Sequence, residues 1–378
     1  MSRRPDPGRS FAVAAAAVLL VASTSAAQVV VDTCGQELND DGILMADLDC
    51  SAAADPIIHF VKSGTLQLNG FTLSGSVEGE VHRIEIVGPG TITGPGPGVA
   101  AYGTFLHGGQ ATVVGANISG NESFGVRATG LGGRAHARVH DSIVSNNGAT
   151  GVSVNTEILC PALTCYSQAK LTVERSTISG NSGDGVRASH IRIKDSSVTF
   201  NGDRGVTVDD GVTRKVRVSG SNIDDNTDEG IFMLSWQSAK LIVSDSSISR
   251  NAVGLLDGGQ YRVGIKLKRC TIDDNGIGIW VSGGSNNPEE RKRLNLKDTT
   301  VLRSATSGVL ATTDTTSINL SRSTVSDSAT APGCGATEAC ADLETVTVPA
   351  VRAGSICGTS LVEGSGIPGT SWGVCALD

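Results

Sequence analysis

The stretch STISGN at residues 176–181 returns as SSISRN at residues 246–251. Its third residue is an apolar anchor that recurs along the chain at spacings of 19 to 34 residues, with a mean near 25. The anchors are Leu73, Ile92, Ile118, Val144, Ile178, Val198, Ile223, Ile248, Ile272, Val301 and Val325. A period of this length is typical of chains built from stacked repeats, because one repeat alone cannot bury its apolar face.

Further columns of the repeat keep a fixed distance from the anchor. Five residues before it stands an apolar residue, from Leu68 and Val87 through to Leu320, and a second one usually stands two residues earlier. This alternation with period two predicts strands. An asparagine follows the anchor by three residues at Asn121, Asn147, Asn181, Asn201, Asn226, Asn251 and Asn275. Stacked repeats should therefore place Asn above Asn, with each side-chain amide bonded to the next.

A charged column lies three residues before the anchor. Its members are Asp141, Arg175, Asp195, Gly220, Asp245, Arg269, Asp298 and Arg322. The signs mostly alternate, and opposite charges on neighbouring strands attract. We interpret this column as stacking electrostatics that fixes the register of the repeats, and not as a catalytic set.

The composition favours a narrow core. The chain has 48 Gly and only 3% aromatic residues, and its small and β-branched side chains suit short strands with tight turns. We predict an all-β chain that forms a single-stranded parallel β-helix of about eleven rungs. The net charge of −8 argues against general nucleic-acid binding, which needs a basic surface.

The first 27 residues resemble a secretory signal peptide. Arg3 and Arg4 supply a positive start, residues 11–22 form an apolar run too short to cross a bilayer, and small residues at 25–27 suit cleavage before Gln28. We therefore expect a secreted protein, extracellular or periplasmic, with no membrane span in its mature part.

Nine cysteines in an exported chain indicate disulfides. Cys270 occupies a column of small residues, which predicts a buried free thiol. The other eight form local pairs, although the sequence allows many other pairings: Cys34 with Cys50, Cys160 with Cys165, Cys334 with Cys340, and Cys357 with Cys375. We expect the first pair to staple an N-terminal cap at residues 28–60 and the last two pairs to staple a C-terminal cap at residues 331–378, on either side of a β-helix at residues 61–330. Cys160 and Cys165 lie in an insertion within that β-helix.

Residues 57–330 resemble the right-handed parallel β-helix repeat proteins that share the pectin-lyase-like fold. The stretches LNGFTLSG at 68–75 and GPGTITG at 88–94 are similar to the opening rungs of that family. The start around Cys34 and the end around Cys375 are similar to the caps of uncharacterised secreted bacterial members. The resemblance implies a right-handed coil and, as the commonest ligands of the superfamily, extracellular acidic polysaccharides such as pectin or alginate. It does not fix an activity, because fold and function separate.

Fragments of a catalytic site occur, but in the wrong order. The stretch NTD at 226–228 resembles the first carboxylate motif of polygalacturonase-type hydrolases, and RIK at 192–194 has the letters of their sugar-acid grip. The second fragment precedes the first, and no GHG tripeptide exists. No intact family site is therefore found. Whether the chain is an enzyme is left open, and a polysaccharide lyase, hydrolase or epimerase is the alternative that we keep.

Acidic residues gather near the middle of the repeats. They are Asp203, Asp224, Asp225, Asp228, Asp273 and Asp274. Calcium takes six or more oxygen ligands and is therefore a candidate ion for such a cluster. The other interpretation is a solvated acidic face, which we favour. We expect no required cofactor and assign no metal site.

A basic column lies six residues before the anchor. Its cations are Arg138, Arg192, Arg217 and Lys266, with Thr172 and Ile242 at the intervening repeats. Cations that face the same way along a solenoid can bind a polyanion laid along it. We therefore expect a secreted β-helix protein, monomeric, that binds extracellular acidic polysaccharide. The alternatives are a divergent polysaccharide enzyme and a structural or adhesive surface protein.

Overall fold

The computed structural model describes residues 28–53, 57–80, 83–103, 107–131, 134–157, 168–208, 214–234, 238–259, 262–282, 291–312, 316–326, 341–345, 350–351 and 360–362. The expected signal peptide and six of the paired cysteines lie outside these residues. These six are Cys160, Cys165, Cys334, Cys340, Cys357 and Cys375. Their pairing stays a prediction.

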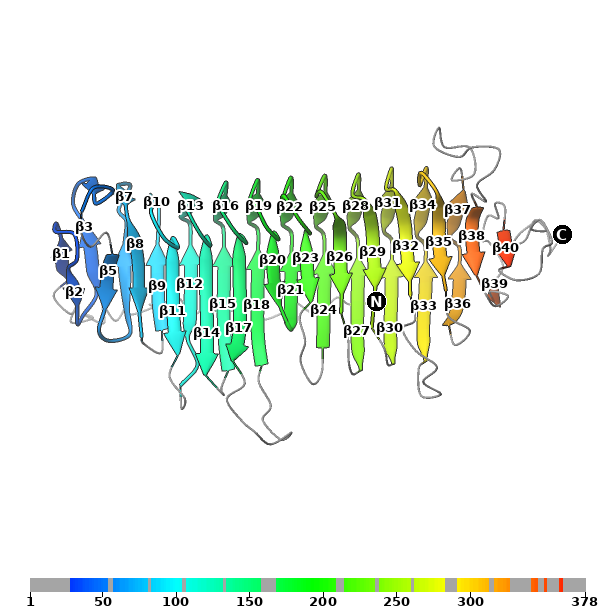
Figure 1. Ribbon diagram of the computed structural model, residues 1–378, viewed down its shortest axis with the longest axis horizontal. Coiled ribbons are helices and arrows are strands. Elements are labelled where there is room, and N and C mark those ends of the chain that lie inside the picture. The colour runs from blue at the N-terminus through cyan, green and yellow to red at the C-terminus, as the bar shows by residue number, and fades with distance from the viewer. Residues whose placement is uncertain are drawn as a thin grey trace, which may run out of the picture.

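Within the described residues, the chain winds through three parallel sheets that run the length of an elongated stack (Figure 1). From β3 to β38, each rung adds one strand to sheet A, then one to sheet C, then one to sheet B, and the chain returns to sheet A; the described rungs at the two ends have no strand in sheet C. The sheets contain 14, 12 and 14 strands for A, C and B. This arrangement is a parallel β-helix, as the repeat predicts.

Sheet A comprises β1 (Val29–Val31), β3 (Gly42–Leu44), β6 (Gly64–Gln67), β9 (Arg83–Val87), β12 (Gln110–Val114), β15 (Arg134–His140), β18 (Gln168–Glu174), β21 (His190–Lys194), β24 (Arg214–Ser219), β27 (Ala239–Ser244), β30 (Val263–Lys268), β33 (Lys292–Lys297), β36 (Thr316–Ser321) and β39 (Ala350–Val351). Sheet C comprises β4 (Leu48–Asp49), β7 (Thr72–Ser74), β10 (Thr91–Gly94), β13 (Asn117–Asn121), β16 (Ile143–Ser145), β19 (Thr177–Ser179), β22 (Ser197–Thr199), β25 (Asn222–Asp224), β28 (Ser247–Ser249), β31 (Thr271–Asp273), β34 (Thr300–Leu302) and β37 (Thr324–Ser326).

Sheet B comprises β2 (Glu37–Leu38), β5 (Ile57–Phe60), β8 (Ser76–Gly79), β11 (Val99–Gly103), β14 (Val126–Leu131), β17 (Val152–Glu157), β20 (Val186–Ala188), β23 (Val206–Val208), β26 (Glu229–Met233), β29 (Val253–Asp257), β32 (Ile277–Val281), β35 (Ser307–Ala311), β38 (Ala341–Thr345) and β40 (Ser360–Val362). Residues 28–60, the expected N-terminal cap, thus contribute strands to all three sheets.

The predicted anchors pair in register down sheet C. Leu73 lies opposite Ile92, and the pairing continues through every anchor to Val325. All of them are buried, with 0% exposure. The anchor column is therefore confirmed, and it forms the sheet C wall of one continuous core.

The column five residues before the anchor is wrong in its first two members. Leu66 and Ile86, not Leu68 and Val87, pair in register and continue into Val113. In these two rungs the connection from sheet A to sheet C is longer by one or two residues than in the regular rungs. Because strand side chains alternate between faces, Val87 instead falls on the outer face of sheet A.

The asparagine ladder forms as predicted. Asn201 donates its side-chain amide to Asn226 Oδ1 at 2.9 Å, and Asn226 donates to Asn251 Oδ1 at 3.0 Å. Each backbone N–H of these residues also donates to the next side-chain oxygen, as from Asn226 to Asn251 at 3.0 Å. Buried amides without partners are costly, so the ladder holds the turn between sheets C and B in one register.

The alternating charge column lies at the turn between sheets A and C. Its residues adopt the left-handed backbone conformation, with φ of 51° at Asp141 and 47° at Arg175, and Gly220 takes the same place with φ of 58°. Arg175 binds the Asp141 carboxylate through two hydrogen bonds of 2.7 and 2.8 Å. The same pairing joins Arg269 to Asp245 and Arg322 to Asp298. Opposite charges thus hold neighbouring turns together where the backbone conformation is unfavourable for most side chains.

Two predictions about cysteines are confirmed. Cys34 and Cys50 form a disulfide with a Cα–Cα distance of 5.5 Å. Cys270 is a free thiol, 2% exposed, and burial raises its pKa. It therefore packs as a small apolar side chain in the core.

Replacing Asn226 with Ala should destabilise the fold by about 2–4 kcal/mol, because the amides of Asn201 and Asn251 lose partners inside the turn. Urea unfolding followed by circular dichroism measures the change. Asn222→Ala is the matched control, since Asn222 lies on the same rung but is exposed. Equal stability of the two variants would show that the ladder contributes nothing.

Candidate functional site

Strand alternation builds a basic surface on sheet A. In β18, Ala169, Leu171 and Val173 point into the core, so Lys170, Thr172 and Glu174 point outward. The same alternation holds in β15, β21, β24, β27, β30 and β33. We call the outward side chains of these seven strands the sheet A face.

The basic column chosen from the sequence runs down the centre of this face. Arg138 lies opposite Thr172, which lies opposite Arg192, and the register continues through Arg217 and Ile242 to Lys266. The structure therefore brings the four predicted cations onto one line along the axis of the solenoid. Their role in binding stays a prediction.

Two flanking columns add basic side chains that the sequence reasoning missed. One column holds His136, Lys170, His190, Lys215, Lys240 and Arg293, and the other holds His140, Glu174, Lys194, Lys268 and Lys297. The sequence could have predicted them, because these positions lie two residues before and two residues after the predicted column and therefore point outward as it does. The rungs of 34 and 20 residues on either side of Ile178 hid the recurrence of the histidines.

The sheet A face extends over six rung spacings, from β15 to β33. At about 4.8 Å for each spacing this is roughly 29 Å. Two open hollows lie on it. One of about 620 Å³ spans β15 to β24, and one of about 900 Å³ is lined by residues of β27, β30, β33 and β36. Among the described outward positions of these seven strands, Glu174 is the sole acidic side chain. A protein of net charge −8 thus presents one long positive face.

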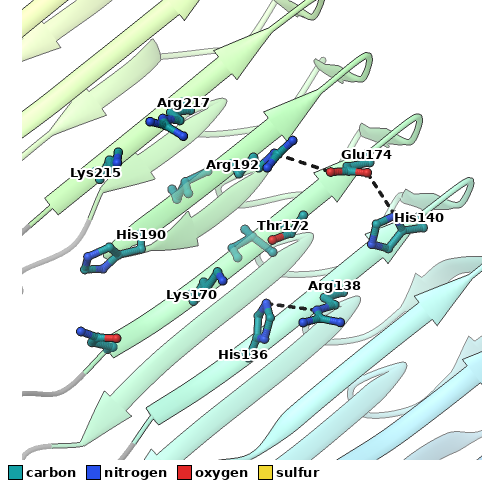
Figure 2. Close-up of a pocket in the computed structure, with 13 residues that line it drawn as sticks. His136, Arg138, His140, Lys170, Thr172, Glu174, His190, Arg192, Lys215 and Arg217 are labelled. Carbon is teal, nitrogen blue, oxygen red and sulfur yellow. Dashed lines mark hydrogen bonds and ion pairs between the residues drawn. The ribbon is translucent and has the colours of Figure 1, made fainter.

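Glu174 lies among the cations of the first hollow (Figure 2). His140 Nδ1 is 3.6 Å from Glu174 Oε2, and Arg192 Nε is 3.6 Å from Glu174 Oε1. A carboxylate is therefore already held between side chains from the two neighbouring strands.

His136 is surrounded by positive charge. Arg138 donates from Nε to His136 Nε2 at 3.5 Å, and Lys170 lies opposite on the next rung (Figure 2). Burial, then Arg138 and Lys170, lowers the pKa of His136 from 6.5 to about 4. The imidazole is therefore neutral at pH 7.

The predicted acidic residues do not meet at one place. Asp224 accepts hydrogen bonds from the backbone N–H of Ser249 at 2.9 Å and from Ser247 Oγ at 3.3 Å. Asp225 is bound by two hydrogen bonds of 2.7 and 2.8 Å from Arg250.

Asp273 and Asp274 share Arg303, which lies on the following rung. Asp274 and Arg303, with Asp225 and Arg250, form a second charge ladder at left-handed turn residues, here between sheets C and B. The pKa of Asp274 is lowered by its hydrogen bond from Arg303, so its carboxylate is already neutralised by the protein.

Asp203 and Asp228 lie on a different part of the turn before sheet B. Their carboxyl groups share a hydrogen bond, which raises the pKa of Asp228. Arg204 next to them pairs with Glu229 at 2.6 Å. Across the part of the chain that the structure describes, no group of three or more His, Cys, Asp or Glu side chains is placed to hold a metal ion. Calcium binding stays a prediction.

The outer face of sheet B carries a feature that the sequence reasoning missed. Phe232, Leu256, Trp280 and Leu310 pair in register on four successive strands and point outward. Arg204 lies over the Phe232 ring at 4.1 Å from its centroid.

Among the described residues, no helix is long and apolar enough to cross a membrane.

Comparison with known proteins identifies the fold. A family model described as right handed beta helix region matches residues 161–251. With the three parallel sheets, this match confirms the right-handed parallel β-helix that the repeat predicts. No curated protein matches the sequence.

Solved structures of several functions share the architecture. Pectate lyase Pel9A is 14% identical over 71% of this chain and 71% of its own, with a TM-score of 0.39. The A-module of the Azotobacter vinelandii mannuronan C-5 epimerase AlgE6 is 15% identical over 88% of each chain, with a TM-score of 0.43. PfbA, a surface adhesin of Streptococcus pneumoniae, is 11% identical over 82% of this chain and 83% of its own, with a TM-score of 0.27. Likenesses this low carry no argument about activity.

The pKa of His136 should be about 4 in the free protein and should rise in the Lys170→Gln variant, because removal of a neighbouring positive charge favours the protonated imidazole. The Cε1 proton signal of His136, followed by NMR between pH 3 and 8, gives the value. Lys62→Gln is the control, since Lys62 lies outside the sheet A face. A pKa near 6.5 in the unmodified protein would contradict the surroundings described.

Proposed function

We propose that this protein binds an extracellular acidic polysaccharide along the sheet A face. The main observation in support is that like charges lie next to one another on the sheet A face. Arg192 lies opposite Arg217, and Lys215 lies opposite Lys240. Like charges placed directly opposite one another are destabilising. At its turns the same chain pairs Asp with Arg on neighbouring rungs.

The geometry selects a long ligand over a small one. The cations recur at the rung spacing over roughly 29 Å, and the hollows are open along the surface. A polyanion that lies parallel to the axis meets a cation at nearly every rung, and it relieves the repulsion between them. Its carboxylates take positions like that of Glu174 between His140 and Arg192.

The experiment is calorimetric titration of the disulfide-intact protein with polygalacturonate, alginate and a neutral glucan. The acidic polymers should bind, the neutral one should not, and added salt should weaken binding because it screens exposed charges. The same samples are assayed for new unsaturated or reducing ends. Turnover would favour a polysaccharide enzyme, and no binding to any polymer would favour a structural or adhesive role.

Replacing either Arg192 or Arg217 with Gln, in two separate variants, should weaken polygalacturonate binding. Each exposed charge contributes roughly 0.5–1 kcal/mol, which is about two- to fivefold in Kd. Arg187→Gln is the charge-matched control, because Arg187 points outward from sheet B. Equal losses in all three variants would show that only net charge matters and that the face is not the site.

Replacing Glu174 with Gln should strengthen binding about two- to fivefold, because it removes the negative charge that is paired with Arg192. Glu122→Gln, at an exposed turn before sheet B, is the control for net charge. Weaker binding by the Glu174 variant would place the ligand elsewhere. The measurement is the same titration at fixed salt.

A further inference from the structure

The first hollow of the sheet A face gathers three histidines among permanent cations. His136 and His140 lie on β15, and His190 lies two rungs further on β21, in the same column as His136. Figure 2 shows the three imidazoles and the side chains of Lys170, Arg138 and Arg192 in one hollow. These are three of the six histidines of the chain.

We propose that polyanion binding on this face is coupled to proton uptake by His136, so that acidification strengthens binding. This inference rests on the proposed function and adds a regulation to it. A bound polyanion places negative charge beside Arg138 and Lys170, the two cations that oppose protonation of His136. By linkage, a ligand that favours the protonated imidazole binds more tightly when the proton is available.

The groups around His136 allow this coupling. On its own strand it is flanked by Arg134 and Arg138, each two residues away, and by His140, four residues away. On one side β12 presents uncharged Gln110 and Thr112.

On the other side β18 presents Gln168, Lys170 and Thr172, and its Glu174 lies opposite His140 at the far end of the strand. The strands β14 and β17 pack behind β15, and Arg127 of β14 is on the outer face of sheet B. Among the outward side chains of β12, β15 and β18, Glu174 is the sole acid, and it is already paired with His140 and Arg192.

The direction and size of the effect follow from the free protein. His136 is neutral above pH 5, because burial and its cationic neighbours hold its pKa at about 4. A bound polyanion offsets the charges of Arg138 and Lys170 but leaves the burial, so the pKa of His136 should rise only part of the way to 6.5. Binding should then take up less than one proton at pH 5.5 and gain less than about tenfold in affinity between pH 7 and pH 5.5.

The test is titration calorimetry with polygalacturonate at pH 7.0 and 5.5, each in two buffers of different ionisation enthalpy. The difference between buffers gives the number of protons taken up. The variant is His136→Gln, which keeps a neutral polar side chain. The control is His59→Gln, because His59 lies on β5 of sheet B, away from the face.

We expect proton uptake and tighter binding at pH 5.5 in the unmodified protein and in His59→Gln, and loss of both in His136→Gln. Binding without proton uptake, or uptake that His136→Gln leaves unchanged, would overturn the coupling and leave the proposed function standing. No binding by the unmodified protein at either pH would overturn both. An NMR titration of His136 in the unmodified protein, free and bound, decides the question if the variant fails to fold, since an unchanged pKa excludes the coupling.

Discussion

Parallel pairing of each strand with the same strand of the next rung is the interaction on which the structure depends. It satisfies the backbone hydrogen bonds of every internal strand and sets a spacing of about 4.8 Å between equivalent residues. Any residue type that recurs with the repeat becomes a straight column. Inward columns fill a core of Leu, Ile, Val and Ala, turn columns become the Asn and Asp–Arg ladders, and outward columns become extended surfaces. The fold thereby converts a period in the sequence into linear arrays of one chemistry.

The turn ladders and the sheet A face use this constraint in opposite ways. At the turns, opposite charges alternate, and Arg250 grips Asp225 with both guanidinium donors. On the face, Lys268 lies opposite Lys297 and His190 lies opposite Lys215 without an intervening acid. A local rule that the chain obeys in its Asp–Arg turn ladders and breaks along one surface is typical of a functional site. The repulsion is tolerated because the exposed cations are well solvated, and a polyanion would relieve it.

The fold could be predicted well from the sequence because the anchor, the Asn column and the charged turn column each recur once in nearly every repeat. The sequence predicted one column of the face, Arg138, Arg192, Arg217 and Lys266, and these residues do align. It missed the histidines, because an insertion and a short rung break the spacing on either side of Ile178. The predicted acidic residues do not lie at one place, for another reason. Asp224 and Asp225 are adjacent in sequence, but Asp225 adopts a left-handed conformation, with φ of 58°, that turns it toward Arg250. Neighbours in sequence point apart at such a turn, which a count of nearby acids cannot detect.

Glu174 lies where the positive charges of the face meet those of a turn ladder. Around it converge His140, Arg192 and, at 4.0 Å, Arg175 from the turn ladder. Without an acid at this point the cations of two rungs would repel one another most strongly, because the turn cation adds to those of the strands. One carboxylate offsets part of that repulsion, and it leaves the cations on either side available. Neutral His136 and Thr172 act similarly, since each interrupts a line of permanent charge. The free face therefore carries less positive charge than its basic residues would give if all of them were charged. Protonation of His136 would raise that charge, and a bound polyanion would offset it.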